Sequence, residues 1–401
     1  MAYNIIVEGF RDVEYPMLTC KTYLDHEGTT VSCDPAELSG HAVDFIRNQA
    51  LRFFSADPEH FDLVFSANAI AAIKLVAEFI RDPAASGSVS GTFWYWYHKD
   101  SHPSLIGVRE LTNGTHHCFN NDEEVEEWLN GTPCVSNSGI KYDWPKRVRQ
   151  STDIAHQNTY SILDAAALAT TTQLDFSDPD SALDFTALSF YKIFGFPDLG
   201  ALIIRRKSNH ILSRRKHFGG STISCVTVLH ESTFQRKNET IHYGLEDGTL
   251  PSHNNVALGC AIDGHERLYK SIKIISQHTL FLSNRLYIGI SKLRHSNSRS
   301  LCIIYSDTTD AYPYTDAITQ GATIAFNVPD IKGNYIGYSH IEMAANEKYK
   351  RAWSAGHRCG GANPQEIING KPTGVVRASL GAMSIMAEVE STFYPSHLRT
   401  E

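Results

Sequence analysis

A single lysine, Lys192, stands among aromatic residues in the segment SFYKIFGFPDLG. A lysine amine that is surrounded by apolar side chains has a lowered pKa, and it then acts as a nucleophile at neutral pH. Such an amine can bond covalently to the aldehyde group of a cofactor. The alternative is that Lys192 extends its stem over an apolar turn and keeps its ammonium group in water.

An acidic residue, Asp164, ends the apolar stretch YSILDA that precedes this segment. If both stretches are strands of one sheet, Asp164 and Lys192 face the same crevice at the strand ends. Pyridoxal phosphate needs both groups, because a lysine holds its aldehyde and an acid keeps its pyridine nitrogen protonated, which makes the ring an electron acceptor. Taken alone, an acid in this position is more typical of a helix cap or a solvated carboxylate, and it is the pairing with Lys192 that favours the cofactor.

The phosphate group of such a cofactor needs backbone amides or hydroxyl groups around it. The segment VFSANAIAAIK predicts a strand, a short turn and a helix, so that the amides of Ala67, Asn68 and Ala69 face an anion. Ser66 or Asn68 could instead serve only as a helix cap. In HFGGST, two glycines allow close backbone approach and Ser221 and Thr222 offer hydroxyl groups, although most glycine pairs form ordinary turns.

Three further side chains are candidates for contacts with a cofactor or a substrate. His102 follows the aromatic stretch FWYWYH and could stack on a ring or transfer protons. Asn137, in the segment SNSG, could hydrogen-bond a phenolic oxygen of the cofactor, or could be a turn residue. Arg377, in TGVVRASLG, could grip an α-carboxylate with both ends of its guanidinium group, or form a surface ion pair.

The composition limits the classes of protein to which the chain can belong. Its 401 residues, 42% hydrophobic and 20% charged, predict a folded protein with more than one domain. The formal net charge of −8 argues against nucleic acid or an anionic membrane as a partner. No apolar run reaches the ~20 residues that a membrane span needs. The eight cysteines contain no CxxC pair, which favours reduced thiols over disulfides or a metal site, so we expect a cytoplasmic protein.

Helical and strand patterns alternate through the first part of the chain, up to about residue 205. This alternation predicts an α/β fold with a mostly parallel sheet covered by helices on both faces. From about Asn255, a long helical pattern leads into short strands and a final helix. We expect a large cofactor-binding domain over residues 28–262 and a smaller α+β domain formed by residues 1–27 and 263–401.

In their order along nearly the whole chain, these segments resemble the aminotransferase-like domain of the molybdenum cofactor sulfurase family, within the cysteine desulfurase and class V aminotransferase group. The segments that carry the resemblance include YLDHEGTT, VFSANAIAAIKLV, SHPSLIGVRE, SNSGIKYDW, ILDAAALATTTQLDFS, SFYKIFGFPDLGALI, HFGGST, LEDGT, KGNYIGYS and KPTGVVRASLGAMS. The resemblance implies the type I fold of pyridoxal phosphate-dependent transferases, with a sheet of the seven-stranded type. It also implies pyridoxal 5'-phosphate as the cofactor, a small amino acid as the substrate, and a homodimer.

The resemblance gives each candidate residue a role. Lys192 would carry the cofactor, Asp164 would pair with its pyridine nitrogen, and His102 would stack on its ring. Asn137 would reach the phenolic oxygen, and Arg377 would bind the carboxylate of the substrate. The residues that would hold the phosphate are Ala67, Asn68, Ala69 and, from the partner subunit, Ser221 and Thr222.

The sequence departs from the family pattern where sulfur is transferred. A cysteine-rich loop presents the persulfide-forming thiol in the family, but the sequence runs from IGYS to AGHRCGG without it, and Cys359 is not the family's sulfur acceptor. Ile70 replaces a residue that usually carries a hydroxyl group, and the C-terminal domain of the sulfurases has no expected counterpart.

We therefore expect lyase-type chemistry at Cα or Cβ of a cysteine-like or other β-substituted amino acid. The reaction would be an elimination with C–S cleavage, or carbon–carbon bond formation at Cβ. Two alternatives stay open. One is a cysteine desulfurase that uses Cys359 as its sulfur acceptor, and the other is a catalytically silent relative that acts as a binding module.

Overall fold

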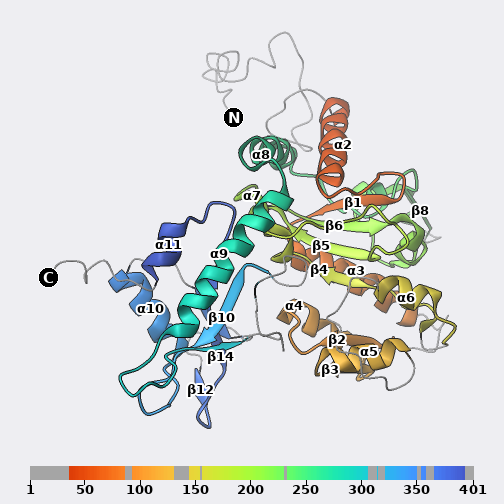
Figure 1. Ribbon diagram of the computed structural model, residues 1–401. Coiled ribbons are helices and arrows are strands. Elements are labelled where there is room, and N and C mark those ends of the chain that lie inside the picture. The colour runs from red at the N-terminus through yellow and green to blue at the C-terminus, as the bar shows by residue number, and fades with distance from the viewer. Residues whose placement is uncertain are drawn as a thin grey trace, which may run out of the picture.

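The computed structural model describes residues 36–85, 93–130, 144–153, 156–229, 233–305, 314, 321–349, 354–357 and 365–392. Asn137 and Cys359 lie outside these residues. Figure 1 shows an upper layered region around one sheet, a smaller unit at the lower right, and a C-terminal region at the lower left that begins with a long helix.

The central sheet has the strand order β1 (Phe61–Ser66), β6 (Gly200–Arg205), β5 (Phe185–Ser189), β4 (Ile162–Asp164). Strands β4 and β5 are parallel, whereas β6 runs antiparallel to both β5 and β1. The predicted mostly parallel arrangement therefore holds for β1, β5 and β4, which share one direction.

Seven strands do not assemble into this sheet among the described residues. Two strands of the same half of the chain, β2 (Tyr95–His98) and β3 (His116–Phe119), pair only with each other, in parallel. A cavity lies between this pair and the central sheet, and its lining includes aromatic side chains of β2 as well as residues of β4. Among the described residues, the central sheet has four strands, and β2 and β3 form a separate pair.

Helices cover both faces of the central sheet, as the alternating pattern predicts. Helices α2 (Ala36–Phe53) and α8 (Ser252–Tyr269) pack together on one face, and α3 (Ala69–Ala85) packs on the other (Figure 1). In β1, Phe61, Leu63 and Phe65 join the core beneath α2 and α8, while Val64 joins the core of α3. Because both faces are buried, the strands appear in the sequence as nearly continuous apolar runs.

The long helical pattern after Asn255 is two helices, α8 and α9 (Ile272–Lys292). The chain breaks between them at Lys270, whose φ of 69° is unusual for a residue with a side chain. The Ser271 side chain then caps α9 by accepting a hydrogen bond from the amide of Ile274 at 3.4 Å. The predicted domain boundary at residue 262 falls inside α8.

The C-terminal region contains a four-stranded antiparallel sheet that packs against α9. Its strand order is β11 (Ser354–His357), β14 (Gly374–Ser379), β10 (Thr323–Asn327), β9 (Ile303–Tyr305). Helices α10 (Tyr338–Tyr349) and α11 (Met386–Ser391) complete this part. These strands and helices agree with the small α+β unit that the sequence predicts.

The remaining elements are short. They are α4 (Pro103–Ile106), α5 (Asp122–Asn130), α6 (Trp144–Gln150), α7 (Phe190–Phe194), β7 (Ile223–Val226), β8 (Phe234–Arg236), β12 (Ile367–Ile368), β13 (Lys371–Pro372), and the 3-10 turns η2 (Gly107–Leu111), η4 (Leu168–Thr170), η5 (Arg206–Arg214), η6 (Gly220–Thr222) and η7 (His242–Gly244).

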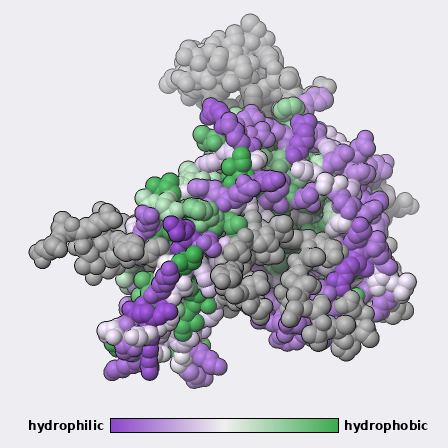
Figure 2. All heavy atoms as spheres, in the orientation of Figure 1, coloured by the Kyte–Doolittle hydropathy of each residue, from purple (hydrophilic) through white to green (hydrophobic). Residues whose placement is uncertain are grey.

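Some apolar side chains reach the surface of the C-terminal region. Ile274, Phe281 and Ile288 of α9 are all exposed. Figure 2 shows apolar residues at the surface in the part of the view where α9 runs, while most of the coloured residues at the right of the view are hydrophilic. Within the described ranges, no helix combines the length and the apolar character that a membrane crossing requires.

Candidate active site

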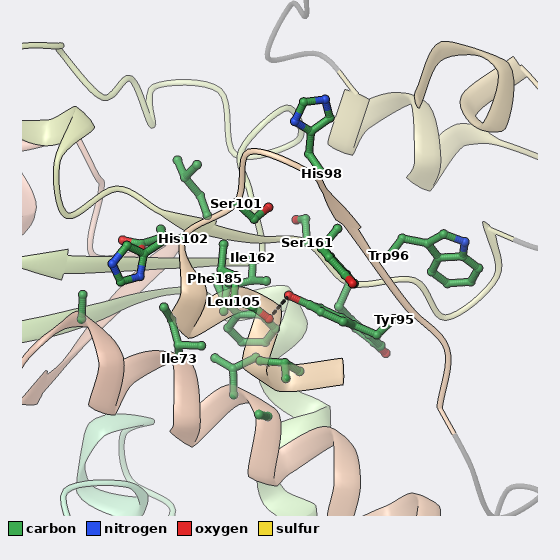
Figure 3. A pocket seen from close by; sticks show the side chains of 18 of the residues that line it. Ile73, Tyr95, Trp96, His98, Ser101, His102, Leu105, Ser161, Ile162 and Phe185 are labelled. Carbon is green, nitrogen blue, oxygen red and sulfur yellow. Dashed lines mark hydrogen bonds and ion pairs between the residues drawn. The ribbon is translucent and has the colours of Figure 1, made fainter. Parts of the chain in front are cut away.

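A cavity of about 1420 Å³ lies between the central sheet with α3 and the β2–β3 pair. Its wall is formed by residues of α3, of β2 and the turn after it, of β4, and of α7, and Figure 3 shows part of this lining, including Ile73, Tyr95 and His102. This volume exceeds the ~300–1,000 Å³ of most ligand pockets, so a cofactor and an amino acid fit together. The predicted site residues that line it are Ala67, Asn68, Ala69, His102, Asp164 and Lys192.

Asp164 and His102 come together in this cavity although they lie on different elements. Asp164 is the last residue of β4, and its side chain is 14% exposed. Its Oδ1 accepts a hydrogen bond from the amide of Ala166 at 3.1 Å, and its Oδ2 lies 3.9 Å from Nδ1 of His102. A carboxylate oriented in this way is suited to pair with a protonated ring nitrogen of a ligand.

The His102 ring is oriented by the helix that it caps. Its Nδ1 accepts a hydrogen bond from the amide of Ser104, at 3.2 Å, at the start of α4. The neutral ring therefore carries its proton on Nε2. The side chain is 56% exposed and borders the cavity, as Figure 3 shows. His102 can thus contact a ligand with its ring face or with Nε2.

Lys192 lies in α7, a short helix between β5 and β6, rather than in a turn between two strands. The helix ends at Gly195, whose φ of 84° suits glycine at a helix C-terminus. Phe190 and Ile193 of α7 are buried in the core, whereas Lys192 is exposed and lines the cavity. The expectation that aromatic neighbours bury Lys192 is therefore wrong: the helical period directs Phe190 inward and the lysine outward, and Tyr191 and Phe196 are themselves 39% and 51% exposed.

The predicted phosphate-binding turn lies between β1 and α3, and two of its groups already have partners. The side chain of Asn68 accepts a hydrogen bond from the amide of Ala71 at 3.0 Å, so Asn68 does cap the helix. The amide of Ala69 donates to Oγ of Ser189 at 3.3 Å, which leaves an anion to the other amides of this turn. Ile70 is exposed and lines the cavity, so its side chain offers no hydroxyl group to a phosphate there.

Gly200 lets this turn sit against the sheet. A Cβ atom built on Gly200 would lie 2.4 Å from the carbonyl carbon of Asn68 and 2.7 Å from the carbonyl oxygen of Leu188. Both contacts are shorter than any side chain tolerates, so only glycine allows the turn and the end of β5 to approach so closely. The turn of residues 67–69 thus has a defined position relative to α7, which follows β5.

Ser221 and Thr222 do not line this cavity. They belong to η6, and the buried Thr222 directs its Oγ1 to the carbonyl oxygen of Gly219 at 2.8 Å. The prediction that they serve the site of a partner subunit is not tested by a single chain. It stays a prediction.

Arg377 also lies away from the cavity lining. It is an exposed residue of β14, opposite Ala325 of β10 and Ser354 of β11. Its predicted role at a substrate carboxylate stays a prediction. The described cysteines, Cys118, Cys225, Cys260 and Cys302, do not line the cavity either.

Two cavity residues were not found from the sequence. Ser189 ends β5 and accepts a hydrogen bond from the amide of Ala69. The sequence feature that could have identified it is a polar residue at the carboxyl end of an apolar strand. Tyr95 of β2 donates through its hydroxyl group to the carbonyl oxygen of Leu105 at 2.9 Å, as the dashed line in Figure 3 marks. Burial, with a smaller effect of Tyr97, raises the pKa of Tyr95, so this hydroxyl stays protonated.

A family model described as aminotransferase class-V matches residues 146–391. The chain belongs to the class V aminotransferase family. Molybdenum cofactor sulfurases of Aspergillus niger and Botryotinia fuckeliana are each 42% identical to it, over 96% and 97% of the chain. The matches cover 53% and 55% of those two proteins, so the chain spans about half the length of these curated relatives.

Solved structures share the fold at low sequence identity. A cysteine desulfurase from Thermococcus onnurineus NA1 has a TM-score of 0.64 and 20% identity, and the match covers 98% of each chain. The cystine C–S lyase C-DES, in complex with cysteine persulfide, has a TM-score of 0.60 and 14% identity, covering 97% of this chain and 93% of the lyase. Another C-DES structure holds glycine linked to its pyridoxal phosphate cofactor. The predicted family and the predicted type I fold of pyridoxal phosphate enzymes are thereby confirmed.

Proposed function

We propose that this chain binds pyridoxal 5'-phosphate and cleaves a bond at Cβ of a small, cysteine-like amino acid. The observation that carries the proposal is the convergence of Asp164, His102 and Lys192 on one cavity that also contains the N-terminus of α3. Three separate elements, β4, α4 and α7, bring these groups together, and each group has a use in this chemistry.

The residues fit the cofactor. Lys192 would hold its aldehyde, Asp164 would pair with its pyridine nitrogen, and His102 would lie against its ring. The turn of residues 67–69 would hold the phosphate at the positive end of α3. When bound, the cofactor supplies an electron sink that stabilises negative charge at the substrate's Cα.

The chain's own groups would carry the proton transfers. Lys192 is exposed to the cavity and, as a free amine, is a base for the α-proton of a substrate. His102 would act as an acid rather than as a base: the lone pair on Nδ1 already accepts from Ser104, so Nε2 carries a proton that it can give to the leaving group. We propose that Arg377, Ser221 and Thr222 act in a homodimer, where the partner subunit completes each site.

The relatives favour sulfur as the leaving group. They include proteins described as molybdenum cofactor sulfurases, as a cysteine desulfurase and as a cystine C–S lyase. The second candidate function, a desulfurase that passes sulfur to Cys359, is favoured by the same names. The described cysteines lie outside the cavity lining, so this route would need a cysteine outside the described residues, and Cys359 is the one that the sequence nominates. It would yield alanine, whereas elimination yields pyruvate and ammonia.

The test is to incubate the purified chain and pyridoxal phosphate with L-cysteine and L-cystine, and to measure pyruvate, ammonia, alanine and sulfide. We expect a visible absorbance band that is absent in Lys192→Ala, and pyruvate formation that depends on the cofactor. Alanine formation that disappears in Cys359→Ser would instead establish the desulfurase. A wild-type protein that stays colourless with added cofactor would refute both and would favour a binding module.

A further inference from the structure

A buried ion pair covers the outer edge of β1, the strand that leads into the turn of residues 67–69. The amide of Phe65 donates to Oε1 of Glu246 at 2.8 Å, and Nη1 of Arg47 donates to the carbonyl oxygen of Leu63 at 2.5 Å. Arg47 also binds both oxygens of Glu246, at 2.7 and 3.1 Å. Since β6 occupies the other edge, this pair takes the hydrogen bonds that a further strand would take.

The geometry of this pair permits little movement. The side chains of Arg47 and Glu246 are 3% and 6% exposed, and the guanidinium group lies 4.8 Å from the ring centroid of Phe65. A two-pronged contact between arginine and carboxylate defines both distance and orientation. Leu63 and Phe65, just before the turn of residues 67–69, are therefore held from the side as well as through the sheet.

The next residue, Asp247, holds a second segment in the same manner. Its Oδ1 accepts a hydrogen bond from the amide of Gly219 at 3.1 Å, and its Oδ2 lies 2.7 Å from Nη1 of Arg215. A Cβ atom on Gly219 would lie 2.1 Å from the carbonyl oxygen of Asp247, so the two backbones are in direct contact. Asp247 thereby fixes the start of η6, which carries Ser221 and Thr222.

We propose that the consecutive carboxylates Glu246 and Asp247 are positioning residues that hold two phosphate-facing segments in register. Glu246 holds the turn of residues 67–69, and Asp247 holds residues 219–222. The inference rests on the proposed binding of pyridoxal phosphate, which assigns these segments to the phosphate group. Because the two carboxylates are neighbours in the chain, a shift of one segment is transmitted to the other. Glu246 and Asp247, in the segment LEDG, would thus act on ligand binding without contacting the ligand.

The experiment compares pyridoxal phosphate with pyridoxal, which lacks the phosphate group. Both are titrated into the cofactor-free full chain, and bound ligand is followed by visible absorbance. In Glu246→Gln and Asp247→Asn, we expect the affinity for pyridoxal phosphate to fall about tenfold, as for the loss of one charge-assisted hydrogen bond. The affinity for pyridoxal should stay within about twofold, because the phosphate contacts alone are displaced.

The matched control is Asp184→Asn. Asp184 is a buried carboxylate that precedes β5, at the end of the strand opposite to α7. It forms an ion pair with Arg149 at 3.1 Å and accepts a hydrogen bond from the amide of Ser161. Its substitution should lower the denaturation midpoint but leave the ratio of the two affinities unchanged. If Glu246→Gln does not fold, Arg47→Lys keeps the charge but loses the two-pronged contact, and it should lower the same ratio.

The outcomes separate this inference from the proposed function. A wild-type chain that binds neither ligand, or that binds both equally, refutes the phosphate assignment and this inference with it. A wild-type chain that prefers pyridoxal phosphate, together with carboxylate variants that keep this preference, leaves the proposed function intact and overturns the positioning role. A ratio that falls in the carboxylate variants and not in Asp184→Asn supports it.

Discussion

Replacing Gly200 with alanine should displace the turn that we assign to the phosphate. Gly200 is the first residue of β6, between Ser66 of β1 and Ser189 of β5. The added methyl group would lie 2.4 and 2.5 Å from two backbone atoms of Asn68, where ordinary contacts begin at 3.4 Å. The backbone of Asn68 must therefore move by roughly 1 Å, since a backbone cannot rotate away as a flexible side chain does.

The cost has two parts, which separate measurements can resolve. Overpacking at a tight site lowers the free energy of unfolding by about 1–3 kcal/mol. A displacement of roughly 1 Å at a binding group reduces catalysis by as much as about 100-fold. We therefore expect Gly200→Ala to lose about 1–3 kcal/mol of stability in chemical denaturation. We also expect its affinity for pyridoxal phosphate to fall about tenfold or more.

Gly264→Ala is the matched control, because a Cβ atom there meets nothing within 4 Å. It lies inside α8, where alanine in place of glycine should add about 0.5–1 kcal/mol of stability and leave cofactor affinity unchanged. The reasoning is refuted if Gly200→Ala binds the cofactor as tightly as the wild type does. In that case the position of the turn does not govern the site.

Three other substitutions have definite expected outcomes. Burial lowers the pKa of His265, so the unfolded chain binds a proton near pH 6.5 that the folded chain rejects, and the wild type should lose stability as the pH falls below about 6.5. His265→Phe should remove this loss, which denaturation at pH 5.5 and 7.5 measures; an unchanged difference would contradict the argument. Asp164→Asn should reduce turnover far more than cofactor affinity, because an amide cannot keep a pyridine nitrogen protonated, and equal losses in kinetic and binding assays would count against this role. Lys270→Gly should raise the denaturation midpoint by relieving about 1 kcal/mol of strain at its φ of 69°, and a lower midpoint would disprove this.

The sequence predicts the elements of the fold well where burial dictates the pattern. Strands with two buried faces are apolar throughout, and helices with one buried face repeat every three to four residues. The direction of β6 was not predicted, although its connection to β5 is short. A parallel connection needs about a dozen residues or more, so residues 190–199 are compatible with an antiparallel neighbour. The break at Lys270 lacks the glycine or proline that would have marked it.

The site was predicted in its residues more than in its environment. Lys192 has aromatic neighbours in the sequence, but a helix turns successive residues to different sides, so Phe190 enters the core while Lys192 faces the cavity. Asp164 and His102 were expected to serve one ligand, and they do meet in space. Arg377 and Ser221 could not be placed from the sequence, because their contribution depends on surfaces that strand and turn patterns do not specify.

The pairing of Arg47 with Glu246 joins residues that are 199 positions apart in the chain. A nascent polypeptide that has released β1 and α2 from the ribosome still lacks the carboxylate that will occupy that strand's rim. Until Glu246 emerges, the amide and carbonyl groups along this edge of β1 lack this partner and can form hydrogen bonds with another extended polypeptide. Synthesis of this chain therefore includes an interval in which the edge of β1 is open to wrong pairing, and this interval ends only after Glu246 has been translated.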